Sequence, residues 1–226
     1  MKKLIVASLV LGMAVAAVAD IMLGFDLAGT TAEPWPAATV AANLSTGSGT
    51  NELIRVGLGT AASANAYGSN GWNLTDVFDN SGDYVSFTLA PAAGFQLTLT
   101  DISWSRVNGS NTAPGNGRWG YSIGGGAWTY ETDFALTYAN ASGSWDFTDI
   151  SGTTLPVEFR FWAWGATSIS GGVSATSGSV SFRNSVAGDD IILNGSIVAI
   201  PEPGVLTLMS LGGLVAVLRF ARRRVA

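Results

Sequence analysis

Residues 84–104 read YVSFTLAPAAGFQLTLTDISW, and the alternation within this stretch decides the fold class. Between 84 and 89, the apolar residues Val85, Phe87 and Leu89 occupy every second position, which is typical of a half-buried strand. The same parity runs through 95–99 and then switches to Ile102 and Trp104. A switch inside one run predicts a β-bulge or corner near 100–101, as expected where a strand crosses between two sheets.

Other short alternating runs lie at 157–161, 180–182 and 191–198. Clusters of Gly, Asn, Asp, Ser and Pro separate the runs and predict turns at 80–83, 108–109, 114–117, 124–126 and 171–172. No window outside the two termini shows an apolar stripe of helical period. We therefore expect residues 20–198 to form an all-β, antiparallel β-sandwich that is jelly-roll-like, with an immunoglobulin-like sandwich as the alternative.

The residue types that the chain lacks exclude several kinds of chemistry. It contains no Cys and no His, and its only lysines are Lys2 and Lys3. Disulfides, thiolate metal sites and Ser-His-Asp or Cys-His relays are therefore excluded. Two carboxylates remain as a possible device for hydrolysis, but no acid lies in a distinctive motif. We expect no enzyme activity.

The central region is strongly acidic. Residues 20–200 contain five arginines against fifteen aspartates and glutamates, a net charge of −10. A surface of this sign repels the phosphates of nucleic acids, so a nucleic-acid partner is not expected. The excess charge favours the solubility of a secreted protein.

The N-terminus is typical of a secretory signal peptide. Two lysines precede an apolar run from Leu4 to Val18, and the small residues Ala17 and Ala19 form an A-x-A cleavage site. We therefore expect residues 1–19 to be a signal peptide that is cleaved after Ala19, and the following domain to be exported. An uncleaved anchor is the alternative.

The C-terminus has three parts in a fixed order. The tripeptide Pro201-Glu202-Pro203 precedes an apolar stretch, residues 205–218, and a basic end made of Arg219, Arg222, Arg223 and Arg224. As a helix, the apolar stretch would be about 21 Å long, which is short of the roughly 30 Å hydrocarbon core of a bilayer. The arginines favour the cytoplasmic side. The segment is therefore a marginal transmembrane helix, or a membrane-entry segment that is later removed.

Residues 199–226 resemble the PEP-CTERM sorting signal. The resemblance rests on Pro201, Glu202 and Pro203, on the apolar helix and on the arginines that follow it. It implies that the chain is processed by an exosortase, a membrane cysteine transpeptidase of bacteria that make extracellular polysaccharide. It also implies at least transient membrane anchoring, followed by delivery to the cell surface or extracellular matrix. A plain tail anchor is the alternative.

A looser resemblance covers residues 24–198. The order Tyr84-x-x-Phe87, Gly94-Phe95-x-Leu97, Val157-x-Phe159-Arg160 and Asp189-Asp190-Ile191-x-Leu193-x-Gly195 is similar to the β-sandwich ectodomains of PEP-CTERM proteins and to jelly-roll carbohydrate-binding modules. The long Ser/Gly-rich segment 171–186 departs from that pattern, which expects a compact segment before the last strand.

The tryptophans supply candidate glycan-binding residues. Trp162, Trp164 and Arg160 share one face of a predicted strand, where aromatic rings and a guanidinium group can stack on sugars. The alternative is a second buried face in which Arg160 pairs with a carboxylate. Trp119 and Trp128 flank the Gly-rich turn at 124–126. They either line a groove at the edge of the loop or cap the end of the sandwich.

Four acidic residues are candidates for a structural calcium site. In sugar-binding modules of this fold, a carboxylate before the last strand often holds Ca²⁺ against the first strand, which here implies Asp189 and Asp190. Asp26 and Glu33 lie near the first strand and are the predicted partners, because calcium requires six to eight oxygen ligands. Charged residues in a solvated turn are the alternative, and no other cofactor is expected.

Two functions outside catalysis remain. The chain is either an exported structural component of the cell surface or matrix, which is our main expectation, or a binding module for exopolysaccharide. An exposed patch that contains two of the candidate tryptophans would favour the second function.

Overall fold

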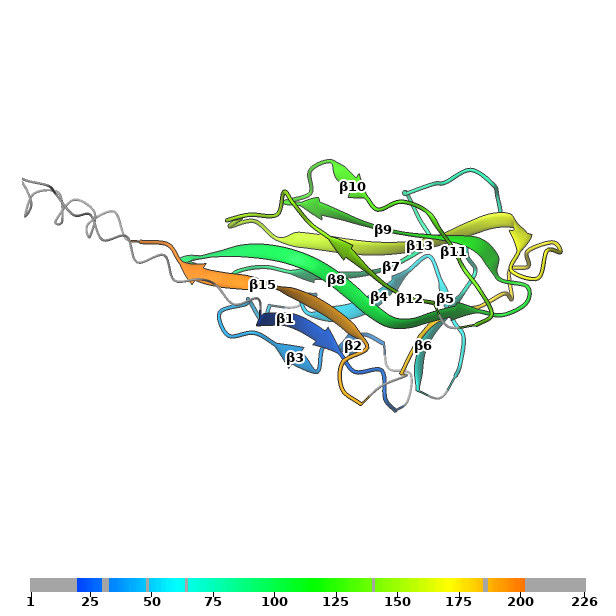
Figure 1. Cartoon of the computed structure of the whole chain (residues 1–226), viewed down its shortest axis with the longest axis horizontal. Helices are drawn as coiled ribbons and strands as arrows, with labels where there is room; N and C mark the ends of the chain where they lie inside the picture. The colour runs from blue at the N-terminus through cyan, green and yellow to red at the C-terminus, as the bar shows by residue number, and fades with distance from the viewer. Residues whose placement is uncertain are drawn as a thin grey trace, which may run out of the picture.

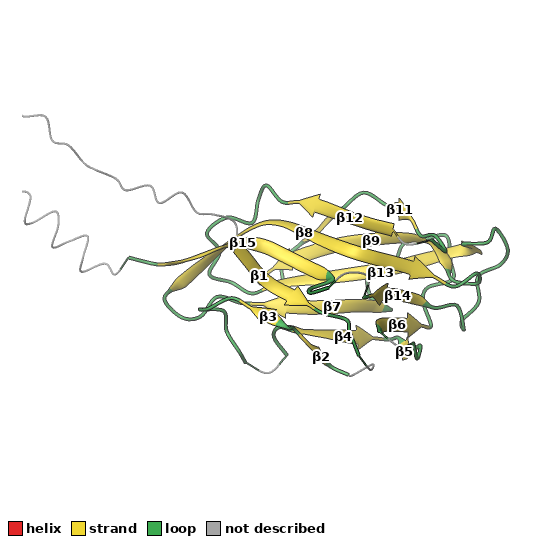
Figure 2. Cartoon of the chain, turned by 60° about the horizontal axis from the view of Figure 1, so that its bottom comes forward, coloured by secondary structure: helices red, strands yellow, loops and turns green. Residues whose placement is uncertain are grey.

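In the computed structural model, the chain folds into two antiparallel β-sheets that pack face to face (Figure 1, Figure 2). The structure describes residues 20–29, 33–47, 49–63, 65–139, 141–184 and 187–201. No helix occurs among them, and so these residues include no helical segment that could cross a membrane. The prediction of an all-β, antiparallel sandwich is confirmed.

The first sheet has eight strands. In spatial order they are β3 (Thr39–Val40), β1 (Asp20–Phe25), β15 (Ile191–Ala199), β8 (Phe95–Gly109), β14 (Val180–Arg183), β6 (Ala66–Asn70) and β5 (Gly59–Thr60), and β12 (Ala141–Asp146) pairs separately with β8. Residues 101–104 of β8 pair with both β12 and β15, and Val107 pairs with both β12 and β14. It follows that β15 and β14 lie end to end along one edge of β8, with β12 along the other.

The second sheet has seven strands. In spatial order they are β10 (Trp128–Tyr130), β9 (Pro114–Ile123), β13 (Val157–Ser168), β7 (Tyr84–Leu89), β4 (Glu52–Val56) and β2 (Trp35–Pro36), and β11 (Phe134–Ala135) pairs separately with β9. The central strand β13 contributes Phe159, which lies directly opposite Phe87 of β7. Their rings stack at a centroid distance of 5.2 Å, so this cross-strand pair anchors the centre of the core.

The bulge that the parity switch predicts is present, but the predicted sheet crossing is wrong. Gly195 pairs with Leu99 and Asn194 pairs with Asp101, which leaves Thr100 as the extra residue of β8. The bulge shifts the pleat by one position, so that Ile102 and the 5%-exposed Trp104 return to the buried face. The bulge therefore accounts for the parity switch without a crossing between sheets, and β8 stays within one sheet from Phe95 to Gly109.

Two of the predicted turns are also part of strands. Residues 108–109 end β8, and residues 114–117 begin β9. The glycines here allow close packing and do not break the strand: a Cβ atom on Gly117 would lie 3.0 Å from the ring of Phe134. By contrast, Gly124 and Gly125 have the positive φ angles of a tight turn, 61° and 73°, and they join β9 to β10 as predicted.

The first and last strands bring the two ends of the described chain to the same end of the molecule. Asp20, the first residue of β1, pairs with Gly195 near the end of β15, and Ala199 pairs with Phe95 at the start of β8. Pro201 is the last described residue and is exposed. The predicted signal peptide with Ala17 and Ala19, the remainder of the Pro-Glu-Pro motif, the apolar stretch and the arginine cluster lie outside the described residues.

Candidate functional site

Trp162 and Trp164 share one face of β13, as predicted, but other side chains cover both rings. Trp162 and Trp164 lie on the outer side of the second sheet, yet only 2% and 5% of their surfaces are exposed. Phe78, from the loop 71–83, packs over both rings at centroid distances of 5.5 and 5.0 Å. Neither ring therefore has a free face on which a sugar could stack.

Arg160 has the contacts of the structural alternative. Its Nε donates a hydrogen bond to Glu158 at 2.6 Å, and its guanidinium group lies over the rings of Tyr84 and Trp128 at 3.9 and 4.4 Å. The charge is thus neutralised by a carboxylate and the planar group is sandwiched by aromatic faces. These contacts also cover part of Trp128, which is half-buried.

Trp119 does not belong to this outer cluster. Its side chain is fully buried between the sheets, where it contacts Trp104, Phe161 and Phe182 at ring distances of 5.3 to 5.8 Å. The sequence predicted that Trp119 lines a groove beside the Gly-rich turn or caps the end of the sandwich. The structure instead places Trp119 in the core. The two tryptophans that flank the turn point to opposite faces of the sheet, so they do not form one site.

The aspartates before the last strand lie against the first strand, as predicted, but their carboxylates already accept hydrogen bonds from backbone and side-chain groups. Asp190 is 2% exposed and accepts hydrogen bonds from the Leu27 N–H at 3.0 Å and the Ser105 hydroxyl at 2.8 Å. Asp189 accepts one from the Thr39 hydroxyl at 2.6 Å. Asp26 accepts from the Ala28 N–H and from an Asn184 amide.

Glu33 belongs to a different cluster. It forms an ion pair with Arg55 and accepts a hydrogen bond from the Tyr67 hydroxyl at 3.0 Å; burial raises the pKa of Tyr67, so the phenol stays protonated. Within the described ranges, no three acidic side chains come together in a way that could hold a metal ion. The four predicted calcium ligands are thus not gathered into one site.

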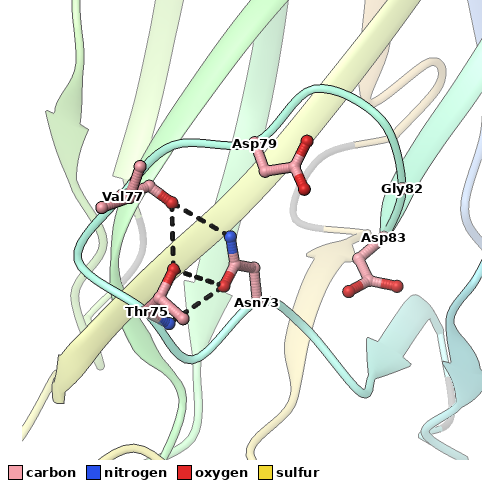
Figure 3. Close-up of a pocket in the computed structure, with 6 residues that line it drawn as sticks. All are labelled: Asn73, Thr75, Val77, Asp79, Gly82 and Asp83. Atoms are coloured by element: carbon pink, nitrogen blue, oxygen red, sulfur yellow. Dashed lines mark hydrogen bonds between the residues drawn. The ribbon is translucent and has the colours of Figure 1, made fainter.

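An acidic hollow of about 300 Å³ lies in the loop 71–83 (Figure 3). On one side, Asn73 accepts hydrogen bonds from the backbone and hydroxyl of Thr75 and donates one to the Val77 carbonyl. Asp79 and Asp83 lie on the other side, and burial together with the nearby Asp79 charge raises the pKa of Asp83. Most of these polar groups serve to hold the loop in the conformation that places Phe78 over the tryptophans.

A second hollow, of about 330 Å³, lies on the outer face of the first sheet. We refer to it as the β8–β14 hollow, because these two strands form its floor; it is lined by Arg106, Asn108, Gly109, Ser110, Tyr138, Ser179, Ser181 and Arg183. The core residues Val107 and Phe182 alternate with its polar residues along the two strands. The pleat therefore turns Arg106, Asn108, Ser181 and Arg183 to the same outer side.

Tyr138 forms the rim of the β8–β14 hollow. Its side chain is 67% exposed, and the loop that carries it is fixed to the end of β8 by a hydrogen bond from the Gly109 N–H to the Thr137 carbonyl. The backbone N–H of Ser179 donates to the Ser110 hydroxyl at 2.9 Å, and both residues also line the hollow. The hollow thus combines an accessible aromatic ring with guanidinium, amide and hydroxyl groups on one face of a hydrogen-bonded sheet.

Comparison with known proteins finds distant structural matches. No protein-family model matches the chain, and no curated protein matches it. Among solved structures, a CBM4 structure is 9% identical over 67% of this chain and 92% of its own length, with a TM-score of 0.41. A mutant of CBM29-2, from family 29 of the carbohydrate-binding modules, is 10% identical over 86% and 97%, with a TM-score of 0.40.

A third match is the N-terminal cellulose-binding domain of Cellulomonas fimi β-1,4-glucanase C. It is 14% identical over 73% of this chain and 99% of its own length, with a TM-score of 0.34. Identities and TM-scores of this size support no argument about the ligand of this chain.

Proposed function

We propose that the chain is an exported surface protein whose jelly-roll-like sandwich binds carbohydrate in the β8–β14 hollow. The observation that carries this proposal is the combination of groups in the hollow. An exposed aromatic ring, Tyr138, can pack on the C–H face of a sugar, and the side chains of Asn108 and Ser181 can exchange hydrogen bonds with its hydroxyls. Convergent polar groups beside an accessible ring are typical of ligand sites.

The position of the hollow suits a surface protein. It lies at the end of β8 that is far from the chain ends: Phe95 pairs with Ala199, whereas Arg106 lies eleven residues further along the strand. At about 3.3 Å per residue, this separation is roughly 36 Å. If the C-terminal segment is held in a membrane, the hollow therefore lies at the end of the sandwich far from that segment, within reach of an extracellular polymer.

Delivery to that surface is assigned to the two ends of the chain. In this proposal a signal peptide, residues 1–19, exports the sandwich, and the Pro201-Glu202-Pro203 motif presents it to an exosortase. Replacing Glu202 with Ala should then block processing, which mass spectrometry of the mature protein would detect as a retained C-terminus. An unchanged mature mass would contradict the sorting role and leave a plain tail anchor.

The proposed role is binding without catalysis. The lack of His and Cys supports it, because the common nucleophile–base relays require these residues. The main competing function is an inert structural component of the surface, which was our first expectation from the sequence. The β8–β14 hollow favours binding over this alternative, since an inert sandwich has no need of an accessible ring among convergent polar groups.

A glycan array tests the proposal. The full-length chain should be purified in a detergent without a sugar headgroup, so that the detergent does not occupy the hollow. We expect selective retention of glycans, and we expect Tyr138→Ala to weaken it by up to about tenfold, since aromatic contacts contribute about 0.5–1.5 kcal/mol beyond their buried area and about 1.4 kcal/mol is tenfold. Leu155→Ala is the matched control, because Leu155 is also exposed but does not line the hollow. Failure to retain any glycan would favour the inert structural role.

A further inference from the structure

We infer that the β8–β14 hollow selects carbohydrates that carry carboxylate groups, such as polymers of uronic acids. The inference rests on the carbohydrate-binding function proposed above and specifies the chemical class of the ligand. It follows from the two arginines in the hollow, Arg106 and Arg183.

These two arginines differ from the other three because neither forms an ion pair with a described residue. Of the five arginines in the described part of the chain, the other three pair with carboxylates, as Arg55–Glu33, Arg118–Asp133 and Arg160–Glu158. Acidic residues outnumber arginines three to one in residues 20–200, so partners are plentiful. Even so, both unpaired cations lie in one hollow.

The two cations are also neighbours across the sheet. β14 pairs with β8 in a register that sets Ser181 opposite Asn108 and Phe182 opposite Val107. Arg183 and Arg106 are the next residues of the two strands, so the alternation turns both to the outer face, where they line the same hollow. Two like charges in one hollow repel each other, so their placement has a cost that folding alone does not explain.

The hydrogen bonds of the two side chains are incomplete in the same way. The Nε atom of each arginine is buried and has no acceptor among the described protein atoms. Arg183 donates from Nη2 to the Ser63 hydroxyl at 2.9 Å, which fixes its position. Arg106 donates to no described residue. An unpaired buried donor costs free energy. Because each Nε is buried, a carboxylate in the hollow would accept from the Nη atoms of the guanidinium groups.

The neighbouring groups make the expected anion part of a sugar and not a free ion. A guanidinium group binds a carboxylate through two parallel hydrogen bonds, and Asn108 and Ser181 lie beside the arginines to engage ring hydroxyls. Tyr138 supplies an apolar face at the rim. The volume, about 330 Å³, is at the small end of the roughly 300–1,000 Å³ range of ligand pockets, which suits a short segment of a polymer.

Charge elsewhere opposes nucleic acid as the ligand. Two arginines in a region of net charge −10 cannot neutralise a run of phosphates, and the remaining surface would repel them. A polyuronate carries one carboxylate per sugar ring and is repelled by the same surface, so its selection must come from paired hydrogen bonds between its carboxylates and the two guanidinium groups in the hollow. Duplex DNA is therefore a suitable polyanion control.

The experiment compares polygalacturonate with the same polymer after its carboxylates have been reduced to alcohols. The full-length chain, in a detergent without a sugar headgroup, is titrated with each polymer and with duplex DNA at low ionic strength. We expect polygalacturonate to bind about tenfold or more tightly than the reduced polymer and than DNA. Arg106→Gln and Arg183→Gln should each weaken the binding of polygalacturonate about tenfold. Arg118→Gln, which changes the net charge equally but lies on the second sheet, should not.

The outcomes separate this inference from the function on which it rests. If the reduced polymer binds as tightly as polygalacturonate, carboxylate selection is overturned while carbohydrate binding stands. If no polysaccharide binds, both are overturned. Equal binding of DNA, or equal losses in Arg118→Gln, would show non-specific attraction and overturn the assignment. Melting midpoints establish that the variants fold; should a Gln variant unfold, Arg106→Lys and Arg183→Lys keep the charge but lose the fork, and should still weaken polygalacturonate binding.

Discussion

Asp190 connects the first and last parts of the sandwich's sequence through Leu27. The backbone N–H of Leu27 donates to the Asp190 Oδ2 at 3.0 Å, although 163 residues separate the two. The other carboxylate oxygen, Oδ1, accepts from the Ser105 hydroxyl at 2.8 Å, and the Asp190 N–H donates to the Phe25 carbonyl at 2.7 Å. One buried side chain therefore holds the end of β1, the turn before β15 and the middle of β8. Buried backbone groups at a strand end need such partners.

We predict that Asp190→Ala lowers the free energy of unfolding by about 3 kcal/mol, because it leaves the Leu27 N–H and the Ser105 hydroxyl buried without their acceptor. Urea denaturation followed by tryptophan fluorescence measures the change. Asp189→Ala is the matched control: Asp189 is less buried and accepts one hydrogen bond, from Thr39, so its loss should cost about 1 kcal/mol. Equal costs for the two variants would contradict the joining role of Asp190.

The same contacts lead to a prediction about calcium. The sequence suggested an ion held by Asp26, Glu33, Asp189 and Asp190, but calcium requires six to eight oxygen ligands. The oxygens of Asp190 already accept from N–H and O–H donors, and Glu33 is paired with Arg55. We therefore expect the melting midpoint to be the same in EDTA and in millimolar calcium. A fall in EDTA that calcium reverses would restore the ion site.

The covered tryptophans of β13 give a third prediction. Phe78→Ala should remove the ring that lies over Trp162 and Trp164, shift tryptophan emission to longer wavelength and cost about 2 kcal/mol of stability, less than the roughly 3–5 kcal/mol for a fully buried ring. Carbohydrate affinity should not change, because the β8–β14 hollow lies on the other sheet. A gain in affinity would show that the uncovered tryptophans bind sugar, as the sequence suggested.

The strands that sequence predicts well are those with long, regular alternation. Residues 84–89 and 95–104 lie in β7 and β8, and the parity switch near 100 marks a real bulge. Strands of two or three residues, such as β2, β3 and β5, have no such signal, because their pairing is imposed by tertiary neighbours. Likewise, glycines at 114–117 indicate a turn locally but serve close packing in β9.

The candidate site was harder to predict because three distant segments build it. Arg106 and Asn108, Tyr138, and Ser181 with Arg183 meet only when β14 aligns with β8. One signal was available: both arginines are adjacent to core residues, Val107 and Phe182, so parity places them on the outer face. For Trp162, the alternation along the strand likewise predicts the outer face, but it does not predict that the loop 71–83 covers the ring.

Glu131 provides a prediction about pH. It follows β10, its Oε2 is buried without a described partner, and burial raises the pKa of its carboxyl to about 7. In the unfolded chain the group ionises near its ordinary value of about 4.5, so between these two values the unfolded state has released a proton that the folded state still holds. Stability contributed by the protonated group is therefore present below pH 4.5 and is lost as the pH rises towards 7.

Glu131→Gln should remove this loss, because the amide is neutral at every pH and has nearly the same shape. Urea midpoints of the two proteins should be similar at pH 4.5, and the variant should be the more stable at pH 8. Comparing the difference between the proteins at each pH cancels the titration of the other carboxylates, which both share. A difference that is the same at pH 4.5 and pH 8 would mean that Glu131 ionises equally in the folded and unfolded chains, and that its buried oxygen finds a partner on folding.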